Sequence, residues 1–218
     1  MKLKSSPGIQ PPRIPKLSST EAPKYIENGA DYSAQAWGNA DFTLQKSAEA
    51  TFEQIRFKRA ILNQLELERA RFTDVLIETS DLSGITLTKS HLRRVAIENS
   101  RMLGANFSES RFEDAIFKDT NLENAIFVMD DIKHTRFQNC SLRNARFENT
   151  DLSGIVFAKC DLTNVILHNV KLDSTDFRGS TISGMQVDAK DIHGAIIESS
   201  QASQVVGLLG LTIKELDE

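Results

Sequence analysis

An apolar residue recurs at every fifth position of the chain, from Phe52 to Ile197, without a gap. All thirty positions in this range whose numbers end in 2 or 7 carry leucine, isoleucine, valine, methionine or phenylalanine. A period of five matches neither the 3.6-residue repeat of an α-helix nor the two-residue alternation of a β-strand. The backbone must therefore turn a corner every five residues.

A second position, two residues before the apolar one, often carries a small or branched side chain. Examples are Ala60, Ala70, Ser80, Ser90, Ser100, Ala105, Ser110, Ala115, Ala125, Ala145 and Thr150. Small side chains at a second inward position fit a narrow interior whose centre is filled by large ones. Four sides make a square coil of about twenty residues, and stacked coils pair their backbones at about 4.8 Å. The pattern predicts an all-β solenoid in which Phe117, Phe137 and Phe157 lie over one another.

Several five-residue stretches share the form A(D/N)LXX. Residues 160–164 (CDLTN), 105–109 (ANFSE) and 80–84 (SDLSG) fit this form closely. In these features the chain resembles the pentapeptide-repeat proteins, whose fold is a right-handed quadrilateral β-helix. The resemblance implies about seven coils over residues 51–199, followed by a short C-terminal capping helix. It says little about function, because one scaffold can host many roles.

The first 24 residues differ from the rest of the chain in proline content and in charge. All five prolines lie within residues 1–23. Five basic residues against one acidic residue give this segment a charge of +4, which leaves −8 for the remainder of a chain whose net charge is −4. We expect residues 1–24 to form a flexible, basic, proline-rich arm. Such an arm either binds or tethers a partner, or is a leader without a role of its own.

Residues 25–50 contain the only tyrosines and the only tryptophan of the chain, Tyr25, Tyr32 and Trp37. An uncovered solenoid end exposes apolar core and unpaired strand edges. We expect this segment to be an N-terminal cap whose aromatic side chains cover the first coil.

Residues 200–218 follow the last apolar repeat. A serine as N-cap, apolar residues on one side and glycines at the exit predict a capping helix followed by an extended tail. This segment resembles the C-terminal helix of the quinolone-resistance pentapeptide-repeat proteins, which pairs two rods end to end, and the resemblance implies a homodimer. The candidate dimer contacts are Val205, Leu208, Leu209, Leu211 and Ile213. Simple capping of the solenoid end explains the same residues.

Histidine and cysteine, the residue types that most often bind metals, form no recognisable motif. The four histidines all fall at outward positions: His91, His134, His168 and His193. No two of them are in register on adjacent coils, so we expect solvated side chains and no metal site. Cys140 and Cys160 are twenty residues apart and stacked, at a separation that permits a disulfide. A reducing cytoplasm favours buried free thiols instead.

Two inward positions carry charged residues. Asp130 is expected to stack between Ser110 and Thr150, whose hydroxyls can donate hydrogen bonds to its carboxylate. Lys190 falls near the final coil, where its aliphatic stem can reach water past the cap. Neither has a paired acid or base, and a filled interior offers no pocket. We therefore expect no enzyme activity, no cofactor and no small-molecule substrate.

One side of the coil carries an apolar stripe on its outer surface. The candidate partner-binding residues are Leu76, Ile116, Val156 and Ile196, together with Ala96, and Arg136 and Asp176 interrupt the row. A partner protein can bind such a stripe, or the arm can cover it. The basic cluster at residues 56–59 is too short for a nucleic-acid footprint. No segment is apolar for eighteen residues and residues 1–6 lack a signal-peptide core, so we expect a cytoplasmic protein that binds neither nucleic acid nor membrane.

Two classes of function remain open for a non-catalytic rod. The family resemblance implies a DNA mimic that binds a bacterial type II topoisomerase, gyrase or topoisomerase IV, and protects it from inhibitors. Charge counts against it: duplex DNA carries about one negative charge per 1.7 Å, so about seven coils would need roughly twenty net negative charges. The outward positions carry 21 acidic and 18 basic residues. The alternative is a protein-interaction scaffold or a bacterial effector with an unknown partner.

Overall fold

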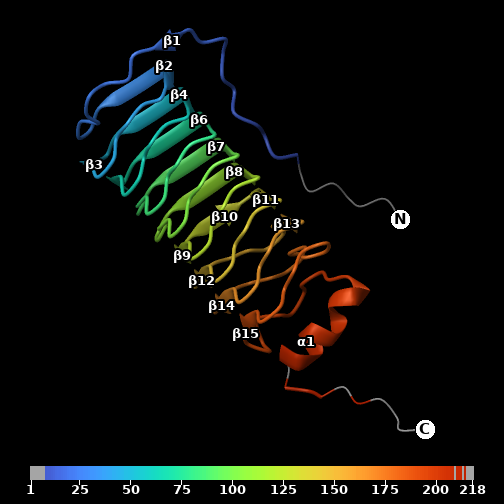
Figure 1. The fold of residues 1–218 in the computed structure, drawn as a ribbon. Helices are drawn as coiled ribbons and strands as arrows, with labels where there is room; N and C mark the ends of the chain where they lie inside the picture. The colour runs from blue at the N-terminus through green and yellow to red at the C-terminus, as the bar shows by residue number, and fades with distance from the viewer. Residues whose placement is uncertain (1–7, 209, 213, 215–218) are drawn as a thin grey trace.

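The chain forms a parallel β-solenoid of about eight turns in a computed structural model that describes residues 8–208, 210–212 and 214. Figure 1 shows the coils stacked along one axis, with the arm at one end and the only labelled helix at the other. The predicted all-β solenoid with a short C-terminal helix is therefore confirmed.

Every strand pair is parallel, as stacking of successive coils requires. The largest sheet has the order β1-β2-β4-β6-β7-β8-β11-β13, and β10 also pairs with β8. Its strands are β1 (Ser19–Thr20), β2 (Asp31–Gly38), β4 (Thr51–Lys58), β6 (Arg71–Glu78), β7 (His91–Glu98), β8 (Arg111–Lys118), β10 (Asp131–Lys133), β11 (Arg136–Gln138) and β13 (Val156–Ala158). A second sheet has the order β15-β14-β12-β9, and β3 pairs with β5. These strands are β3 (Lys46–Ala48), β5 (Glu66–Glu68), β9 (Ile126–Val128), β12 (Arg146–Glu148), β14 (Ile166–His168) and β15 (Gln186–Val187).

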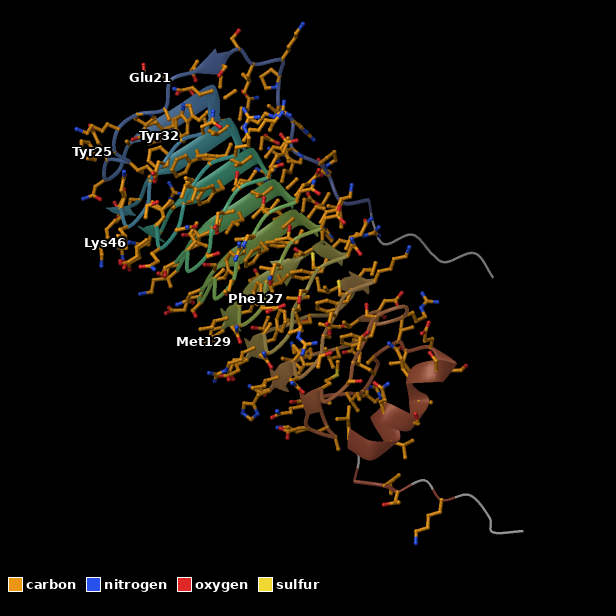
Figure 2. The ribbon with its side chains drawn as sticks, in the orientation of Figure 1. Glu21, Tyr25, Tyr32, Lys46, Phe127 and Met129 are labelled. Atoms are coloured by element: carbon orange, nitrogen blue, oxygen red, sulfur yellow. The ribbon has the colours of Figure 1, made fainter. Side chains whose placement is uncertain are left out.

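Aromatic rings stack in columns inside the coil, because equivalent residues lie twenty positions apart. Phe137 pairs in register with Phe117 on one side and Phe157 on the other. The ring centroids are 5.0 and 5.1 Å apart and the rings are nearly parallel. Figure 2 shows Phe127 within the coil and Met129 at its rim. The predicted alignment of every fifth side chain on one axis is confirmed.

The corners of the coil are made by left-handed residues. From Ala34 to Ser174, the non-glycine residues at numbers ending in 4 or 9 have φ values between 48° and 62°. Asparagine fills many of these positions, including Asn124, Asn144 and Asn164, because its short polar side chain tolerates this conformation. Gly184 has a φ of 67°, and a Cβ there would lie 2.3 Å from the Oδ1 atom of Asn164. Other residues adopt this turn at equivalent corners, so a side chain at position 184 would chiefly require the Asn164 amide to move.

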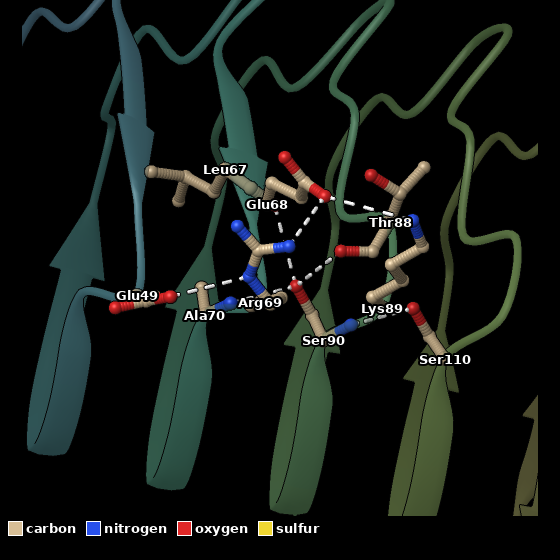
Figure 3. A network of polar contacts seen from close by, with 9 residues as sticks. All are labelled: Glu49, Leu67, Glu68, Arg69, Ala70, Thr88, Lys89, Ser90 and Ser110. Atoms are coloured by element: carbon tan, nitrogen blue, oxygen red, sulfur yellow. Dashed lines mark hydrogen bonds and ion pairs between the residues drawn. The ribbon is translucent and has the colours of Figure 1, made fainter. Parts of the chain in front are cut away.

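Hydroxyl and thiol groups at the small inward position are hydrogen-bonded to the backbone. Figure 3 shows part of this ladder, in which the N–H groups of Ala70 and Ser90 donate to the hydroxyls of Ser90 and Ser110, each at 3.0 Å. The Ser110 hydroxyl in turn donates to the carbonyl of Leu87 at 2.6 Å. Serine is stable in this apolar interior because its hydroxyl both accepts and donates a hydrogen bond.

Cys140 and Cys160 occupy a second ladder of this kind, which also contains Ser80, Ser100 and Ser180, and both are buried free thiols, as predicted. Their sulfurs donate to the carbonyls of Phe117 and Phe137 at 3.3 and 3.4 Å. The neighbouring Cys140 sulfur, and then burial, raise the pKa of the Cys160 thiol. This thiol is therefore a poor nucleophile in the folded chain.

Asp130 lies in the ladder of Ser90 and Ser110, but its bonding differs from the prediction. The backbone N–H of Ser110, not its hydroxyl, donates to Asp130 Oδ1 at 2.7 Å. The Thr150 hydroxyl accepts from the backbone N–H of Asp130 at 3.4 Å and points to the carbonyl of Glu148 at 3.0 Å. The hydroxyls of Ser110 and Thr150 thus donate to backbone carbonyls and not to the Asp130 carboxylate. Asp130 Oδ2 is buried without a partner among the described residues, and burial raises the pKa of this carboxyl to about 8.

The solenoid begins one coil earlier than residue 51, because β2 pairs in register with β4. Trp37 lies over Phe57, with ring centroids 5.3 Å apart, and Tyr32 stacks on Phe52 at 5.5 Å. These two residues are therefore part of the first coil. Tyr25 is 59% exposed and points away from the core at the N-terminal end (Figure 2). Ile26, which is buried, covers the core end in place of Tyr25.

The described part of the arm is attached to the solenoid at two places. In β1, Ser19 pairs with Ala36 of β2. Further toward the N-terminus, the backbone N–H of Arg13 donates to Asp74 Oδ1 at 2.8 Å. Between these contacts the arm runs back alongside the coils (Figure 1). These contacts place the arm beside the side of the coil that carries the apolar stripe.

A 3₁₀-helix, η1 (Ser199–Gln201), and a helix, α1 (Ala202–Leu208), close the C-terminal end. The N-cap is Glu198 rather than the predicted serine, because Glu198 and Gln201 bond to each other's backbone N–H groups. The Gln201 side chain also donates to the carbonyls of Phe177 and Ser180 at 2.9 and 2.7 Å. This buried amide thus satisfies two carbonyls that a further coil would otherwise bond. Among the described residues, no helix has the length and apolar character to cross a bilayer.

Candidate functional site

The interior of the solenoid leaves no room for a ligand. A void of about 20 Å³ lies among apolar side chains of the N-terminal half, including Phe72, Leu82 and Leu87. The larger hollows of the described surface are open to solvent, and one of about 560 Å³ lies beside Asp151 and Lys171. These two residues pair with each other at 3.2 Å. Any recognition must therefore use the outer faces.

The predicted apolar stripe forms one column on the outer surface of the largest sheet. Its members are consecutive partners in register: Leu76, Ala96, Ile116, Arg136, Val156, Asp176 and Ile196. Leu76, Ala96 and Ile116 lie on three adjacent strands, β6, β7 and β8, without interruption. We call these three residues the apolar column.

The other two predicted contact residues are separated from the apolar column. Val156 lies between Arg136 and Asp176, and Asp176 is held by an ion pair with Arg178 at 2.6 Å. Ile196 lies one coil beyond Asp176 and is 38% exposed. The structure thus brings Leu76 and Ile116 into one surface, and it places Val156 and Ile196 singly among charged neighbours.

A buried ion pair lies at the coil corner beside the apolar column. Asp74, Arg94 and Asp114 occupy outward positions, yet they are only 4%, 8% and 6% exposed. Arg94 donates to both oxygens of Asp74, from Nε at 2.7 Å and from Nη2 at 2.5 Å. Burial alone raises the pKa of Asp74, but the hydrogen bonds from Arg94 and from the Arg13 backbone outweigh it and hold the pKa below its usual value. This pair fixes the corner and anchors the arm.

On the other side of this corner, three exposed arginines surround a histidine. Arg71, His91 and Arg111 are partners in register on β6, β7 and β8, and Arg93 lies two residues along from His91. We call Arg71, Arg93 and Arg111 the arginine cluster. Burial, and then the positive charges of these arginines, lower the pKa of His91. The sequence did not predict this cluster, because a count of acidic and basic residues over all outward positions hides a local excess.

Each histidine lies near a carboxylate of an adjacent coil. The nitrogen-to-oxygen distances are 3.9 Å for His91–Glu113, 3.6 Å for His134–Asp114, 3.6 Å for His168–Asp188 and 3.7 Å for His193–Asp173. The four histidine side chains are between 40% and 90% exposed, as expected of solvated surface residues. No group of three or more histidine, cysteine or acidic side chains in the described part of the chain is arranged to hold a metal ion.

Comparison with known proteins identifies the family. A sequence profile described as the pentapeptide repeat region matches residues 50–127 and 90–161, which together span 112 of the 218 residues. The chain belongs to the pentapeptide-repeat family. No curated protein matches it in sequence.

Solved pentapeptide-repeat structures resemble this chain at low sequence identity. One is QnrB1, a plasmid-mediated fluoroquinolone resistance protein, at 19% identity and a TM-score of 0.44, covering 87% of this chain and 96% of QnrB1. Another is HetL from the cyanobacterium Nostoc sp. strain PCC 7120, a protein involved in the regulation of heterocyst differentiation. It shows 16% identity and a TM-score of 0.38, covering 78% of this chain and 87% of HetL.

The C-terminal end of this pentapeptide-repeat chain uses part of its apolar surface for capping. Val205 and Leu208 pack against the end of the core, whereas Leu211 is 61% exposed. Leu209 and Ile213, the other two candidate dimer contacts, lie outside the described residues. Two of the five candidates are therefore engaged within the chain, and a homodimer through this end stays a prediction.

Proposed function

We propose that this pentapeptide-repeat chain is a non-catalytic rod that recognises another protein through an outer face. The apolar column on β6, β7 and β8 is the observation that carries this proposal. Leu76 and Ile116 are half-buried and lie in register with Ala96 on three adjacent strands. Ala96 is only 4% exposed, and the arm, bonded to Asp74, runs beside the column, so a partner would contact chiefly Leu76 and Ile116. Burial of such side chains by a partner is favourable at about 25 cal/mol per Å² of apolar surface.

A rigid surface supports recognition because it lowers the entropic cost of binding. The column lies on strands of eight residues each, which pair in register on both sides of the corner residues Asp74, Arg94 and Asp114. The buried Asp74–Arg94 pair fixes the adjoining corner. Side chains that are already ordered lose little freedom when a partner docks.

A bacterial type II topoisomerase, gyrase or topoisomerase IV, is the named partner that the family resemblance suggests. A DNA mimic requires a continuous negative field. Many acidic side chains of this rod lie instead in ion pairs, such as Asp161 with Arg143 at 3.1 Å and Asp151 with Lys171 at 3.2 Å. This charge pattern favours a protein-interaction scaffold, or an effector with a different partner, over mimicry of DNA along the whole rod.

A supercoiling assay with purified gyrase and a fluoroquinolone separates these two functions, and QnrB1 serves as the comparison protein. Protection of supercoiling by the chain, together with direct binding to gyrase, would establish topoisomerase as the partner. If the chain neither protects supercoiling nor binds gyrase at a molar excess, the protein-interaction scaffold is the remaining function.

Co-purification from the native cell tests the recognition surface itself. Leu76→Lys and Ile116→Lys place charges within the apolar column, and we expect each to remove the co-purifying protein without unfolding the coil. Val156→Lys is the matched control, because Val156 already lies between charged neighbours. If the same protein still co-purifies with Leu76→Lys and with Ile116→Lys, the apolar column is not the recognition surface.

A further inference from the structure

Burial of side chains that point out of the coil is confined to one stretch of the rod. Within residues 31–198, only four outward side chains are buried: Asp74, Arg94, Ala96 and Asp114. They lie on three adjacent strands, β6, β7 and β8. The corner residues of the neighbouring coils, Gln54 and His134, have the same left-handed φ but are half-buried and exposed, respectively. The corner conformation therefore does not account for this burial.

Ala96 shows that ion pairing does not account for it either. This side chain has no charge to pair, yet it is only 4% exposed. Ala36 and Ala158, which also point outward from the largest sheet, are half-buried. Another segment of the chain therefore covers β6, β7 and β8 from outside.

The arm is attached to the sheet in line with the apolar column. Ser19 of β1 pairs with Ala36, which lies two coils before Leu76 in the same register. The second attachment, from the Arg13 backbone N–H to Asp74, lies two residues before Leu76 in the same strand. Between and beyond these two places the arm runs alongside the coils (Figure 1). It therefore passes over the stretch in which outward side chains are buried.

The arm turns its large apolar side chains toward the coil. Ile9, Ile14 and Leu17 are half-buried, whereas both charged residues between positions 8 and 18 are exposed. A short proline-rich segment has no core of its own, so these side chains are buried against the surface beneath them. The four residues from Ile9 to Arg13 extend about 13 Å, which exceeds the two coil spacings of about 4.8 Å between Leu76 and Ile116. The arm is therefore long enough to cover the apolar column.

We propose that residues 8–18 form an autoinhibitory strap, which covers the apolar column and is displaced when a partner protein binds there. This inference rests on the proposed function and adds how the recognition surface is controlled. A tethered segment competes well with a partner, because its effective concentration at the surface is high. The described attachments are also small enough to open, since β1 pairs over two residues and one backbone hydrogen bond joins Arg13 to Asp74.

The strap also indicates the chemistry of the segment that replaces it. Asp74 Oδ1 accepts from the Arg13 N–H at 2.8 Å as well as from Arg94 Nε at 2.7 Å. A replacing segment satisfies the same carboxylate if it is extended and offers a backbone N–H, and its apolar side chains bury the column. The sequence of the strap is therefore itself a suitable probe.

The test uses a fluorescein-labelled peptide with the sequence of residues 8–20, whose binding is followed by anisotropy. In the native chain the strap occupies the column, so we expect the added peptide to bind weakly. In the full-length double variant Ile14→Glu/Leu17→Glu the strap loses its apolar contacts, and we expect the peptide to bind at least about tenfold more tightly. Gln10→Glu/Ser18→Glu is the matched control, because it makes the same change in charge at exposed positions of the arm and should behave as the native chain.

Addition of Leu76→Lys to the Ile14→Glu/Leu17→Glu chain should abolish binding of the peptide, because the peptide occupies the apolar column. The inference is overturned if the native chain and the double variant bind the peptide equally, if the double variant does not bind it, or if binding survives Leu76→Lys. The proposed function is tested separately by co-purification. If Leu76→Lys loses the co-purifying protein while the double variant binds the peptide no better than the native chain, the strap is wrong and the recognition surface stands.

Discussion

Asp130 shows how one side chain departs from a repeating hydrogen-bond scheme. At the equivalent place one coil earlier, the Ser110 hydroxyl accepts from the N–H of Ser90 and donates to the carbonyl of Leu87. Asp130 accepts from the N–H of Ser110 through Oδ1, but an ionised carboxylate has no proton to donate. Its buried Oδ2 is therefore without a partner in the described structure unless the carboxyl is protonated.

The first prediction concerns the pH dependence of stability at this residue. The pKa of Asp130 rises from 3.8 to about 8 on folding, so the folded state holds a proton that the unfolded state has lost across this range. Its contribution to stability is complete below about pH 4 and declines as pH rises to about 8. We expect Asp130→Ser to remove this decline. As pH rises from about 4 to 8, the unfolding free energy of the variant in urea, minus that of the native chain, should therefore grow by up to about 1.4 kcal/mol per pH unit.

Thr120→Ser is the control for this experiment, because it keeps a hydroxyl at a small inward position of the other ladder and introduces no titrating group. Its unfolding free energy should follow that of the native chain at every pH. A constant difference between Asp130→Ser and the native chain from pH 4 to 9 would contradict the protonated carboxyl.

At the scale of elements, the arm is held by a hydrogen bond that one substitution can remove. The backbone N–H of Arg13 donates to Asp74, and proline lacks this donor. We expect Arg13→Pro to raise amide hydrogen exchange in β1, the paired segment of the arm, by about tenfold or more, since a hydrogen bond to a charged group contributes about 1.5–3 kcal/mol. Arg13→Ala retains the N–H and should leave the exchange unchanged. Equal exchange in the two variants would show that the arm is held by other contacts.

The C-terminal cap depends on a single amide. Gln201 donates to the carbonyls of Phe177 and Ser180, and its side chain is buried. Gln201→Leu keeps the volume but leaves both carbonyls without these donors, so we expect a loss of about 1–3 kcal/mol in unfolding free energy and faster exchange in the last coil. Gln204→Leu, at an exposed position of α1, should change neither. A stable Gln201→Leu variant would mean that water replaces the amide.

The elements that the sequence predicted are those that depend on a regular period. Phe137 and the residues twenty positions on either side align because the five-residue repeat alone determines the coil. The first coil was missed because Trp37 and Ser47 occupy positions at which the later repeats carry leucine, isoleucine, valine, methionine or phenylalanine. Gln201 was missed because its role depends on which carbonyls the last coil leaves free. Predicting the Asp74–Arg94 pair requires the register between adjacent coils as well as the positions of the two residues within their own coils.

For the molecule as a whole, stacking in one dimension makes each coil depend on its two neighbours. Phe137 contacts rings on both sides, Phe117 and Phe157, whereas Phe177 has a ring partner only in Phe157. A cavity at the middle of such a column weakens two interfaces, and a cavity near its end weakens one. The position of a substitution along the axis therefore sets its cost.

We expect Phe137→Ala to lower the unfolding free energy by about 3–5 kcal/mol and Phe177→Ala by clearly less, because truncation of a buried phenylalanine leaves a cavity that close packing fills only partly. Phe137→Ala should also divide the calorimetric transition, as the coils on either side unfold with less coupling. Phe177→Ala should instead show a single transition with increased exchange confined to the C-terminal coils. Equal losses for the two variants, each with one sharp transition, would show that the rod unfolds as a single cooperative unit rather than as coupled coils.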